Sequence, residues 1–196
     1  MKRSDVKYLY FISPIDNVPS IMDKGILSHN LARKISHHSV AMPEVQDRRR
    51  NKVIPGAGKL HDYANLYVNA RNPMMYARKE QHISLCVLAV DPRILDETGV
   101  IMSDMNASRG IAFFSSPVIL LPKLKAEEIF AHWWLHEDSI EQDRHKGVMC
   151  AEVLVPERVK PQFIRGAFVS CAEGESTLKK LYPLLKTKID GEMFFQ

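Results

Sequence analysis

Apolar residues in this chain gather in short blocks that are separated by polar and charged stretches. The most apolar block, residues 83–90, is typical of a buried strand. Shorter blocks rich in β-branched and aromatic residues predict further strands. These strands are expected over residues 8–12, 66–69, 100–102, 111–115, 151–155 and 168–171, with residues 193–195 closing the sheet.

Helices are predicted where a residue suited to a helix N-terminus precedes periodic apolar positions. Asn17, Pro43 and Pro73 each open such a segment, and leucines recur at helical spacing in a later one. The predicted helices cover residues 17–22, 43–50, 73–76, 126–134 and 176–185. Residues 26–36 read as irregular, and residues 135–149, which lack apolar periodicity, as an exposed loop or frayed helix end. Short elements without regular βαβ spacing predict an α+β fold.

Composition fits one globular domain over residues 1–196. Of the 196 residues, 45% are apolar and 26% are charged, which suits a proper core. No apolar run reaches the roughly 18 residues of a membrane span, and residues 1–5 lack the apolar stretch of a secretory signal. Three cysteines without a C-x-x-C pair argue against a disulfide framework or zinc site and favour a reducing, cytoplasmic location.

Positive charge is concentrated in one short segment. The net charge of +4 permits a polyanionic partner without requiring one. Arg48, Arg49 and Arg50 are consecutive, so on a helix they point about 100° apart and only one or two can face a groove. Such a residue could bind a phosphate through two hydrogen bonds. The alternative is an ordinary solvated helix face.

Glu152 stands out because it interrupts a short apolar strand, residues 150–156. A carboxylate there either faces solvent or is held at a site, because glutamate is seldom buried without a partner. Cys150 close by suggests a thiol nucleophile, but a cysteine in a strand is more often a small apolar filler.

Residues 61–76 are dense in aromatic and amide side chains. A strand followed by a helix that opens at Pro73 would place free N–H groups beside Tyr67, which suits an anion or a flat ring. An ordinary strand–loop–helix unit with core methionines and tyrosines is the alternative.

Familiar phosphate, dinucleotide, hydrolase and metal motifs are absent from the sequence. It contains no G-x-x-x-x-G-K-[ST], no G-x-G-x-x-G and no G-x-S-x-G. His29, His37 and His38 match no metal-ligand spacing and lack a neighbouring cysteine or acidic cluster. We therefore expect no metal.

Four blocks of sequence follow one another in a characteristic order. They are residues 10–18 with 25–30, residues 45–50, residues 61–63 with 66–68 and 73–76, and residues 151–155. Together they cover most of the chain and resemble the DarT family of DNA ADP-ribosyltransferase toxins. The resemblance implies an ADP-ribosyltransferase-like split β-sheet with an NAD-binding cleft and peripheral helices. It also implies a toxin that transfers ADP-ribose from NAD⁺ to a base of single-stranded DNA.

The resemblance assigns roles to individual residues. Glu152 matches the family's catalytic glutamate, Arg49 its catalytic arginine, and Tyr67 a tyrosine of the nicotinamide pocket. NAD⁺ contacts are expected from Phe11, Ile12, Ser13, Asn17, Leu27, Asn30, Tyr67 and Met74. DNA contacts are expected from Arg48, Arg50, His61, Tyr63, Arg144, His145 and Lys146. Residues 135–149 correspond to the segment that presents the base, and the family pattern implies a macrodomain antitoxin that reverses the modification.

One position departs from the family pattern. The thymine-modifying branch commonly has Tyr-His-Ile at the end of the first strand, whereas this chain has Tyr10-Phe11-Ile12. The missing histidine favours the guanine-modifying branch, with thymine as the second choice.

The chemistry suits a carboxylate. Nicotinamide leaves through an oxocarbenium-like transition state, so Glu152 could bind the ribose 2′-OH, offset the developing charge and accept a proton from the attacking base. A guanidinium stays charged, so Arg49 is better suited to holding a phosphate or the target base. We expect Glu152→Ala to abolish transfer and leave the fold intact.

Three rival functions remain. A non-enzymatic nucleic-acid-binding module could use the same basic and aromatic residues, although Glu152 would repel phosphate. An RNA-directed nuclease toxin that uses His61 and Arg49 is the second. The third is an ADP-ribosyltransferase of the same fold with an RNA or protein acceptor.

Overall fold

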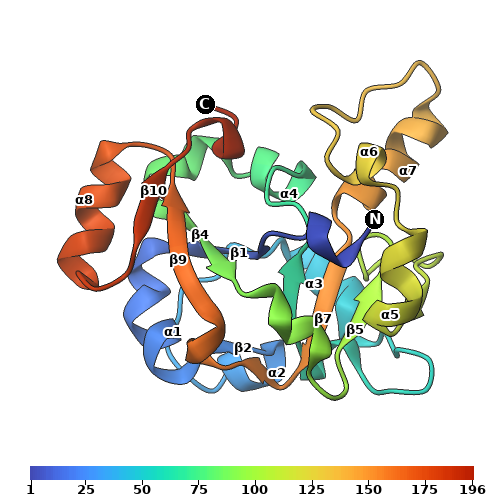
Figure 1. Ribbon diagram of the computed structural model, residues 1–196, viewed down its shortest axis with the longest axis horizontal. Coiled ribbons are helices and arrows are strands. Elements are labelled where there is room, and N and C mark those ends of the chain that lie inside the picture. Colours follow the sequence, from blue (N-terminus) through green and yellow to red (C-terminus); the bar gives the residue numbers. More distant parts are fainter.

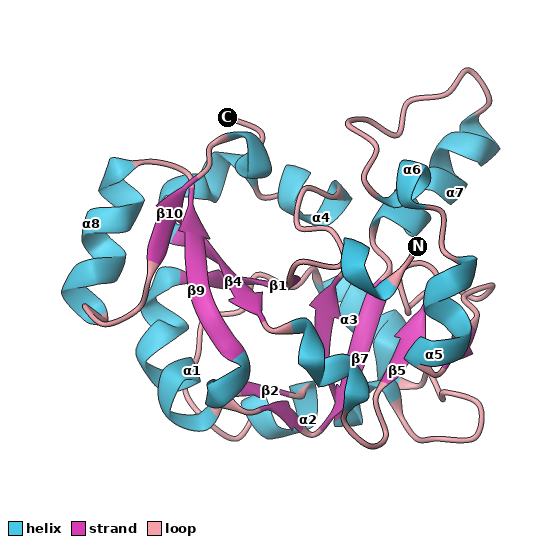
Figure 2. Ribbon diagram, viewed as in Figure 1, coloured by secondary structure: helices cyan, strands magenta, loops and turns pink.

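A mixed eight-stranded sheet runs through the computed structural model, which describes residues 1–196. The strand order is β10-β9-β4-β1-β3-β7-β5-β6 (Figure 2). The strands are β1 Leu9–Pro14, β3 Tyr63–Tyr67, β4 Leu85–Val90, β5 Ile101–Ser103, β6 Phe114–Ser115, β7 Glu152–Pro156, β9 Ile164–Val169 and β10 Thr187–Ile189. A separate pair joins β2 (Ile26–Leu27) to β8 (Arg158–Val159). The predicted α+β class is confirmed.

The large sheet is divided between β1 and β3. Six residues of β1 pair with β4, but only Tyr10 pairs with β3, opposite Tyr67. Beyond this point β3 pairs along its whole length with β7. The two halves therefore separate on one side of β1, and a cavity opens beside this division.

Eight short α-helices surround the sheet. They are α1 Val18–Lys24, α2 His29–Ala32, α3 Pro43–Arg50, α4 Pro73–Tyr76, α5 Pro117–Leu120, α6 Ala126–Ile129, α7 Ser139–Met149 and α8 Ala172–Leu181. Figure 1 shows α1 and α8 beside the β9–β10 end and α5, α6 and α7 beside the β5 end. Eight 3₁₀ turns link these elements: Arg3–Asp5, Ile15–Asn17, Leu60–Asp62, Lys79–Ser84, Pro92–Asp96, Leu121–Lys123, Pro161–Phe163 and Glu192–Phe194. None of the helices has the length and apolarity that crossing a bilayer demands.

The core lies on both faces of the sheet. All six residues of β4 are buried, which explains the unbroken apolar run in the sequence. Cys86, Leu88 and Val90 pack into the larger core, while Leu85 and Val87 contact a smaller one on the opposite face. This alternation is the two-residue period of a strand.

The prediction of an exposed loop or frayed helix end over residues 135–149 is wrong for residues 139–149, which form the regular helix α7. Asp138 caps the helix by accepting a hydrogen bond from the Ile140 amide at 2.8 Å. Polar contacts, and not an apolar stripe, pack α7 against its neighbours. The sequence of α7 therefore lacks the apolar periodicity of a typical helix. Gly147 has a role within it, since a Cβ there would lie 2.6 Å from Arg109 Nε.

Other predicted boundaries also need correction. Residues 26–36 contain β2 and α2, and the predicted helix over 126–134 ends at Ile129. The closing strand is β10, whereas residues 192–194 form a 3₁₀ turn. Phe194 is buried in the smaller core, so its apolar character reflects packing and not strand pairing.

Candidate active site

Glu152 and Arg49 form a buried ion pair. Glu152 begins β7 and is 0% exposed, and Arg49 in α3 is 6% exposed. Two guanidinium nitrogens of Arg49 each donate to one carboxylate oxygen at 3.0 Å. This bidentate geometry fixes the orientation of both side chains. The carboxylate in the apolar strand is therefore held at a site and does not face solvent.

A backbone amide completes the surroundings of Glu152. The N–H of Ala107 donates to Oε1 of the same carboxylate at 3.1 Å. The loop that carries Ala107 is anchored to α7, where the Asn106 amide donates to the Gly147 carbonyl at 2.9 Å. Three donors thus surround one carboxylate at the start of β7.

Tyr67 faces Glu152 across the β3–β7 ladder. Burial and the nearby Glu152 charge raise the pKa of Tyr67 well above its ordinary value, so its hydroxyl stays protonated. Burial alone would lower the pKa of Arg49, but the charge of Glu152 and its hydrogen bonds raise it overall. The group therefore carries one carboxylate, one guanidinium and one neutral phenol.

Cys150 does not have the properties of a nucleophile. Burial, followed by the Glu152 charge, raises its pKa to about 12, which keeps the thiol protonated at neutral pH. Because the thiolate is the reactive form, the thiol-nucleophile alternative loses its support.

A cavity of about 720 Å³ lies beside this group. Arg49, Tyr67 and Cys150 line it, whereas Glu152 itself is not among the lining residues. The carboxylate consequently lies behind its partners in the cavity wall.

Seven of the eight residues predicted to contact NAD⁺ line this cavity. They are Phe11, Ile12, Ser13, Asn17, Leu27, Tyr67 and Met74. Asn30 does not line the cavity, and its amide donates to the Asp62 carboxylate at 2.7 Å. Asn17 is fixed by two hydrogen bonds to the backbone of His38, at 2.7 and 3.0 Å.

The predicted DNA-binding residues divide into three groups, which line the cavity, lie at the surface or contact neighbouring side chains. Arg48 and Lys146 line the cavity, and neither has a carboxylate within 4 Å. Arg50 pairs with Asp47 at 2.9 Å on the surface, and Tyr63 is half-buried. Arg48 and Lys146 are therefore the lining cations without an ion pair, since Arg49 binds Glu152 and Arg109 binds Asp143.

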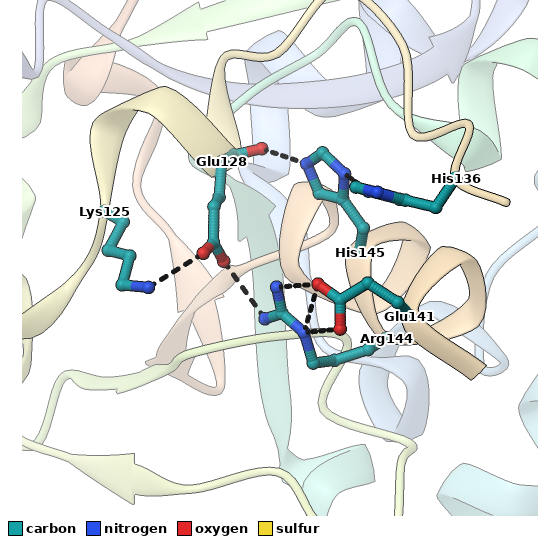
Figure 3. A network of polar contacts seen from close by, with 6 residues as sticks. All are labelled: Lys125, Glu128, His136, Glu141, Arg144 and His145. Carbon is teal, nitrogen blue, oxygen red and sulfur yellow. Dashed lines mark hydrogen bonds and ion pairs between the residues drawn. The ribbon is translucent and has the colours of Figure 1, made fainter. Parts of the chain in front are cut away.

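Arg144 and His145 belong to a polar network that joins α6 to α7 (Figure 3). Arg144 contacts Glu128 at 3.0 Å and Glu141 at 2.7 Å. His145 contacts His136 at 2.8 Å and the Glu128 carbonyl at 2.9 Å. Both residues thus hold α7 against α6, and a role in DNA binding would be additional to this contact.

His61 is buried and stacks on His29, with ring centroids 4.0 Å apart. Burial, then the charges of His29, Arg49 and Arg50, lower its pKa from 6.5 to about 4, with Asp62 opposing. In the unfolded chain His61 binds a proton below about pH 6.5, whereas in the folded protein it does so only near pH 4. The free energy of unfolding therefore decreases as the pH falls from 6.5 towards 4. We expect a loss of about 2 kcal/mol between pH 7 and pH 5 from this residue.

Urea denaturation of the wild type and His61→Phe at both pH values measures this loss. The Nε2 atom of His61 has no hydrogen-bond partner, so phenylalanine removes the titration and keeps the ring stack. The variant should have a smaller pH dependence, whereas His37→Phe, at an exposed histidine, should match the wild type. Equal pH dependence in all three proteins would contradict the assignment.

The sequence did not reveal several contributors to the site. Ala107 acts through its backbone, which leaves no signal in its side chain. Arg109 binds Asp143 at 2.6 Å on the cavity wall, but neither lies in a recognisable motif. Gln46 also lines the cavity, and its buried Oε1 has no hydrogen-bond partner. The one feature of the sequence that could have indicated it is its position in the block of residues 45–50, before the three arginines.

A family model described as "ssDNA thymidine ADP-ribosyltransferase, DarT" matches residues 10–195. A "DNA ADP-ribosyl transferase-DNA ADP-ribosyl glycohydrolase fusion protein" of Thermosipho africanus (strain H17ap60334) is 33% identical over 182 residues, 88% of this chain and 45% of that protein. A "DNA ADP-ribosyl transferase" of Thermus sp. (strain 2.9) is 38% identical over 72 residues, 35% of this chain and 34% of that protein. The chain thus spans less than half the length of the Thermosipho africanus relative.

Solved structures share the fold. "Thermosipho africanus DarTG in complex with ADP-ribose" matches with a TM-score of 0.84 and 29% identity, over 96% of this chain and 51% of that one. "Thermus sp. 2.9 DarT in complex with NAD+" matches with a TM-score of 0.80 and 20% identity, over 97% of this chain and 98% of that one. The second likeness is one of fold alone.

Proposed function

Because this chain belongs to the DarT family, we propose that it transfers ADP-ribose from NAD⁺ to a base of single-stranded DNA and releases nicotinamide. The observation that carries the proposal is the buried Arg49–Glu152 pair in the wall of the large cavity. A buried carboxylate is the group that the transfer needs where a sugar becomes cationic.

The cavity suits NAD⁺ as the substrate. Its volume of about 720 Å³ falls within the usual range of small-molecule sites. Apolar side chains and Tyr67 offer surfaces for the flat rings, while Arg48 and Lys146 offer charge for the pyrophosphate or for DNA phosphates. The relatives named for NAD⁺ and ADP-ribose complexes support this choice.

The transfer exchanges one glycosidic bond for another. The ribose–nicotinamide bond breaks, the pyridinium leaves with the bonding electrons as neutral nicotinamide, and the base attacks the same sugar carbon. The base then loses a proton, which Glu152 accepts or passes to water. Glu152 also binds the ribose 2′-OH and stabilises the positive sugar.

Arg49 must release part of Glu152 for these contacts to form. Both carboxylate oxygens accept hydrogen bonds from its guanidinium, and the carboxylate does not line the cavity. A guanidinium that gives up one of these bonds gains a free N–H group for a phosphate or the target base. Arg49 therefore orients the catalytic carboxylate and contacts the substrate.

Two observations favour different bases. The family model names thymidine, which makes thymine the first acceptor to test and does not support the guanine preference derived from the sequence. Phe11 favours guanine, because it lines the cavity where the thymine-modifying branch commonly has histidine. Guanine is therefore the second candidate.

Among the predicted DNA contacts, we propose Arg48 and Lys146 as the first to contribute, because they line the cavity and have no ion pair. Arg50 and Tyr63 are further candidates at the surface. His61, Arg144 and His145 are each occupied by neighbouring side chains and are assigned the weakest contributions.

We also propose a reversing partner of the macrodomain type. A Thermosipho africanus relative carries a DNA ADP-ribosyl glycohydrolase in the same polypeptide, and this chain spans 45% of that relative. A transferase and an enzyme that removes its product fit a toxin–antitoxin pair.

Mass spectrometry of NAD⁺-treated oligonucleotides tests the proposed function. Mixed and homopolymeric single-stranded DNAs, with RNA of the same sequence as a control, report the reaction, the acceptor and the base together. We expect a mass gain of one ADP-ribosyl unit on DNA that contains the acceptor base. Shortened strands would indicate a nuclease. A gain in mass on RNA alone would identify RNA as the acceptor in place of DNA. Binding of the oligonucleotide without any gain in mass would indicate a non-enzymatic module.

A further inference from the structure

A second, smaller pocket lies outside the candidate active site. It has a volume of about 380 Å³ and is lined by Arg71, Tyr76, Lys79, His132, Trp133, Glu192, Phe195 and Gln196. We call these residues the aromatic pocket. They come from α4 and its flanks, from the segment between α6 and α7, and from the C-terminal end of the chain, which lies near α4 in Figure 1.

The rings of the aromatic pocket support one another and remain accessible. Tyr76 packs edge-on against Trp133 and Phe195, with ring centroids 6.1 and 5.2 Å apart. Trp133 is 44% exposed and Tyr76 is 37% exposed. An ordered aromatic surface that stays open to solvent is suited to stacking a flat ligand.

Positive charge accompanies the rings. The Arg71 guanidinium lies 4.0 Å from the Phe195 ring centroid and 5.0 Å from that of Trp133. The guanidinium donates to the backbone carbonyls of Glu192 and His132 and contacts the His132 ring at 3.5 Å, and it forms no ion pair with a carboxylate. Lys79 lies 4.6 Å from the Tyr76 ring and 3.9 Å from the exposed Glu80 carboxylate. The Glu192 carboxylate lies 3.6 Å from His132.

Helix α4 connects the aromatic pocket to the large cavity. Pro73 and Met74 line the cavity, while Tyr76, two residues after Met74, lines the aromatic pocket. The rise of 1.5 Å per helical residue makes these neighbouring sites. A single strand bound at the cavity is therefore expected to extend along α4 towards Trp133.

We propose that the aromatic pocket binds a nucleotide of single-stranded DNA next to the one that is modified. Its base stacks on Trp133 and Tyr76, and its phosphate faces Arg71 and Lys79. Basic residues combined with aromatic rings bind single strands in this way, with little dependence on sequence. The inference rests on the proposed function, since it assigns a flanking subsite to the same acceptor.

Direct binding tests the subsite without NAD⁺. Trp133 and buried Trp134 are the only tryptophans, so stacking should quench Trp133 emission. We expect Trp133→Ala to weaken binding of a mixed-sequence oligonucleotide of about ten nucleotides by roughly tenfold or more, and Trp133→Phe to weaken it less.

Matched variants separate this role from a structural one. Phe130→Ala removes a ring of similar exposure, 45%, outside the pocket and should leave affinity unchanged. Lys79→Glu should weaken binding in a salt-dependent way, whereas Lys180→Glu on α8 should not. Thermal melting identifies any variant that fails to fold.

Unchanged affinity in folded Trp133→Ala and Lys79→Glu would overturn the subsite. Equal weakening by Phe130→Ala would also overturn its assignment to this pocket. Failure of the proposed function gives a different result, because the oligonucleotide would then bind through the pocket without gaining ADP-ribose.

Discussion

Glu152→Gln is expected to reduce ADP-ribose transfer by about a thousandfold or more. The amide keeps the size of the side chain but lacks the negative charge that stabilises the cationic sugar. It also cannot accept a proton from the attacking base. Labelling of oligonucleotides with radioactive NAD⁺ at saturating concentrations measures the loss.

Glutamine is the better substitution because the pair is buried. Glu152→Ala, which the sequence suggested would leave the fold intact, removes the partner of a buried guanidinium and should cost about 3–5 kcal/mol of stability. Glu152→Gln keeps an acceptor for Arg49 and should cost less. Urea denaturation of both variants provides the control, and a folded Glu152→Gln protein that labels DNA at the wild-type rate would exclude Glu152 as the catalytic carboxylate.

Arg49→Ala and Arg50→Ala are expected to behave very differently although they are adjacent. Arg49→Ala leaves the Glu152 carboxylate buried without its partner, which should cost about 3–5 kcal/mol and eliminate transfer. Arg50 forms an exposed pair with Asp47, so its loss should cost less than about 1 kcal/mol and reduce transfer only slightly. Urea denaturation and the labelling assay measure the two effects separately.

Arg49→Lys distinguishes charge from geometry. A lysine keeps the positive charge but cannot donate two parallel hydrogen bonds to the carboxylate. We expect a protein that regains much of the stability and little of the activity. Equal losses of activity in Arg49→Ala and Arg50→Ala would instead make the arginine run a general electrostatic patch.

The elements that the sequence predicted well are those with a local signal. Pro43 marked the start of α3, because proline is favoured in the first turn of a helix. The apolar run marked β4, because a strand that is buried on both faces requires apolar residues at successive positions. Helix α7 was missed, since the contacts of Arg144 and His145 with α6 replace an apolar stripe. Polar contacts between distant segments leave no periodic pattern.

The candidate site was predictable in its residues but not in its arrangement. Glu152 and Arg49 could be singled out from the chain, yet their direct pairing depends on how α3 approaches β7. The donor from Ala107 is a backbone group and carries no residue signature. Asn30 was expected at the NAD⁺ site and instead binds Asp62, a partner that only the folded chain brings near.

The loop that carries Ala107 couples the position of α7 to the hydrogen bonding of the Glu152 carboxylate. The Ala107 amide donates to Glu152, and the amide of the preceding residue, Asn106, donates to the Gly147 carbonyl on α7. Arg109 from the same loop forms an ion pair with Asp143, one turn before Gly147 on α7. Any ligand that shifts α7 therefore also changes the hydrogen bonding of the carboxylate. By reciprocity, occupation of the sugar site alters the affinity of α7 for that ligand by the same factor. Under the proposed function, binding of donor and acceptor should accordingly be cooperative.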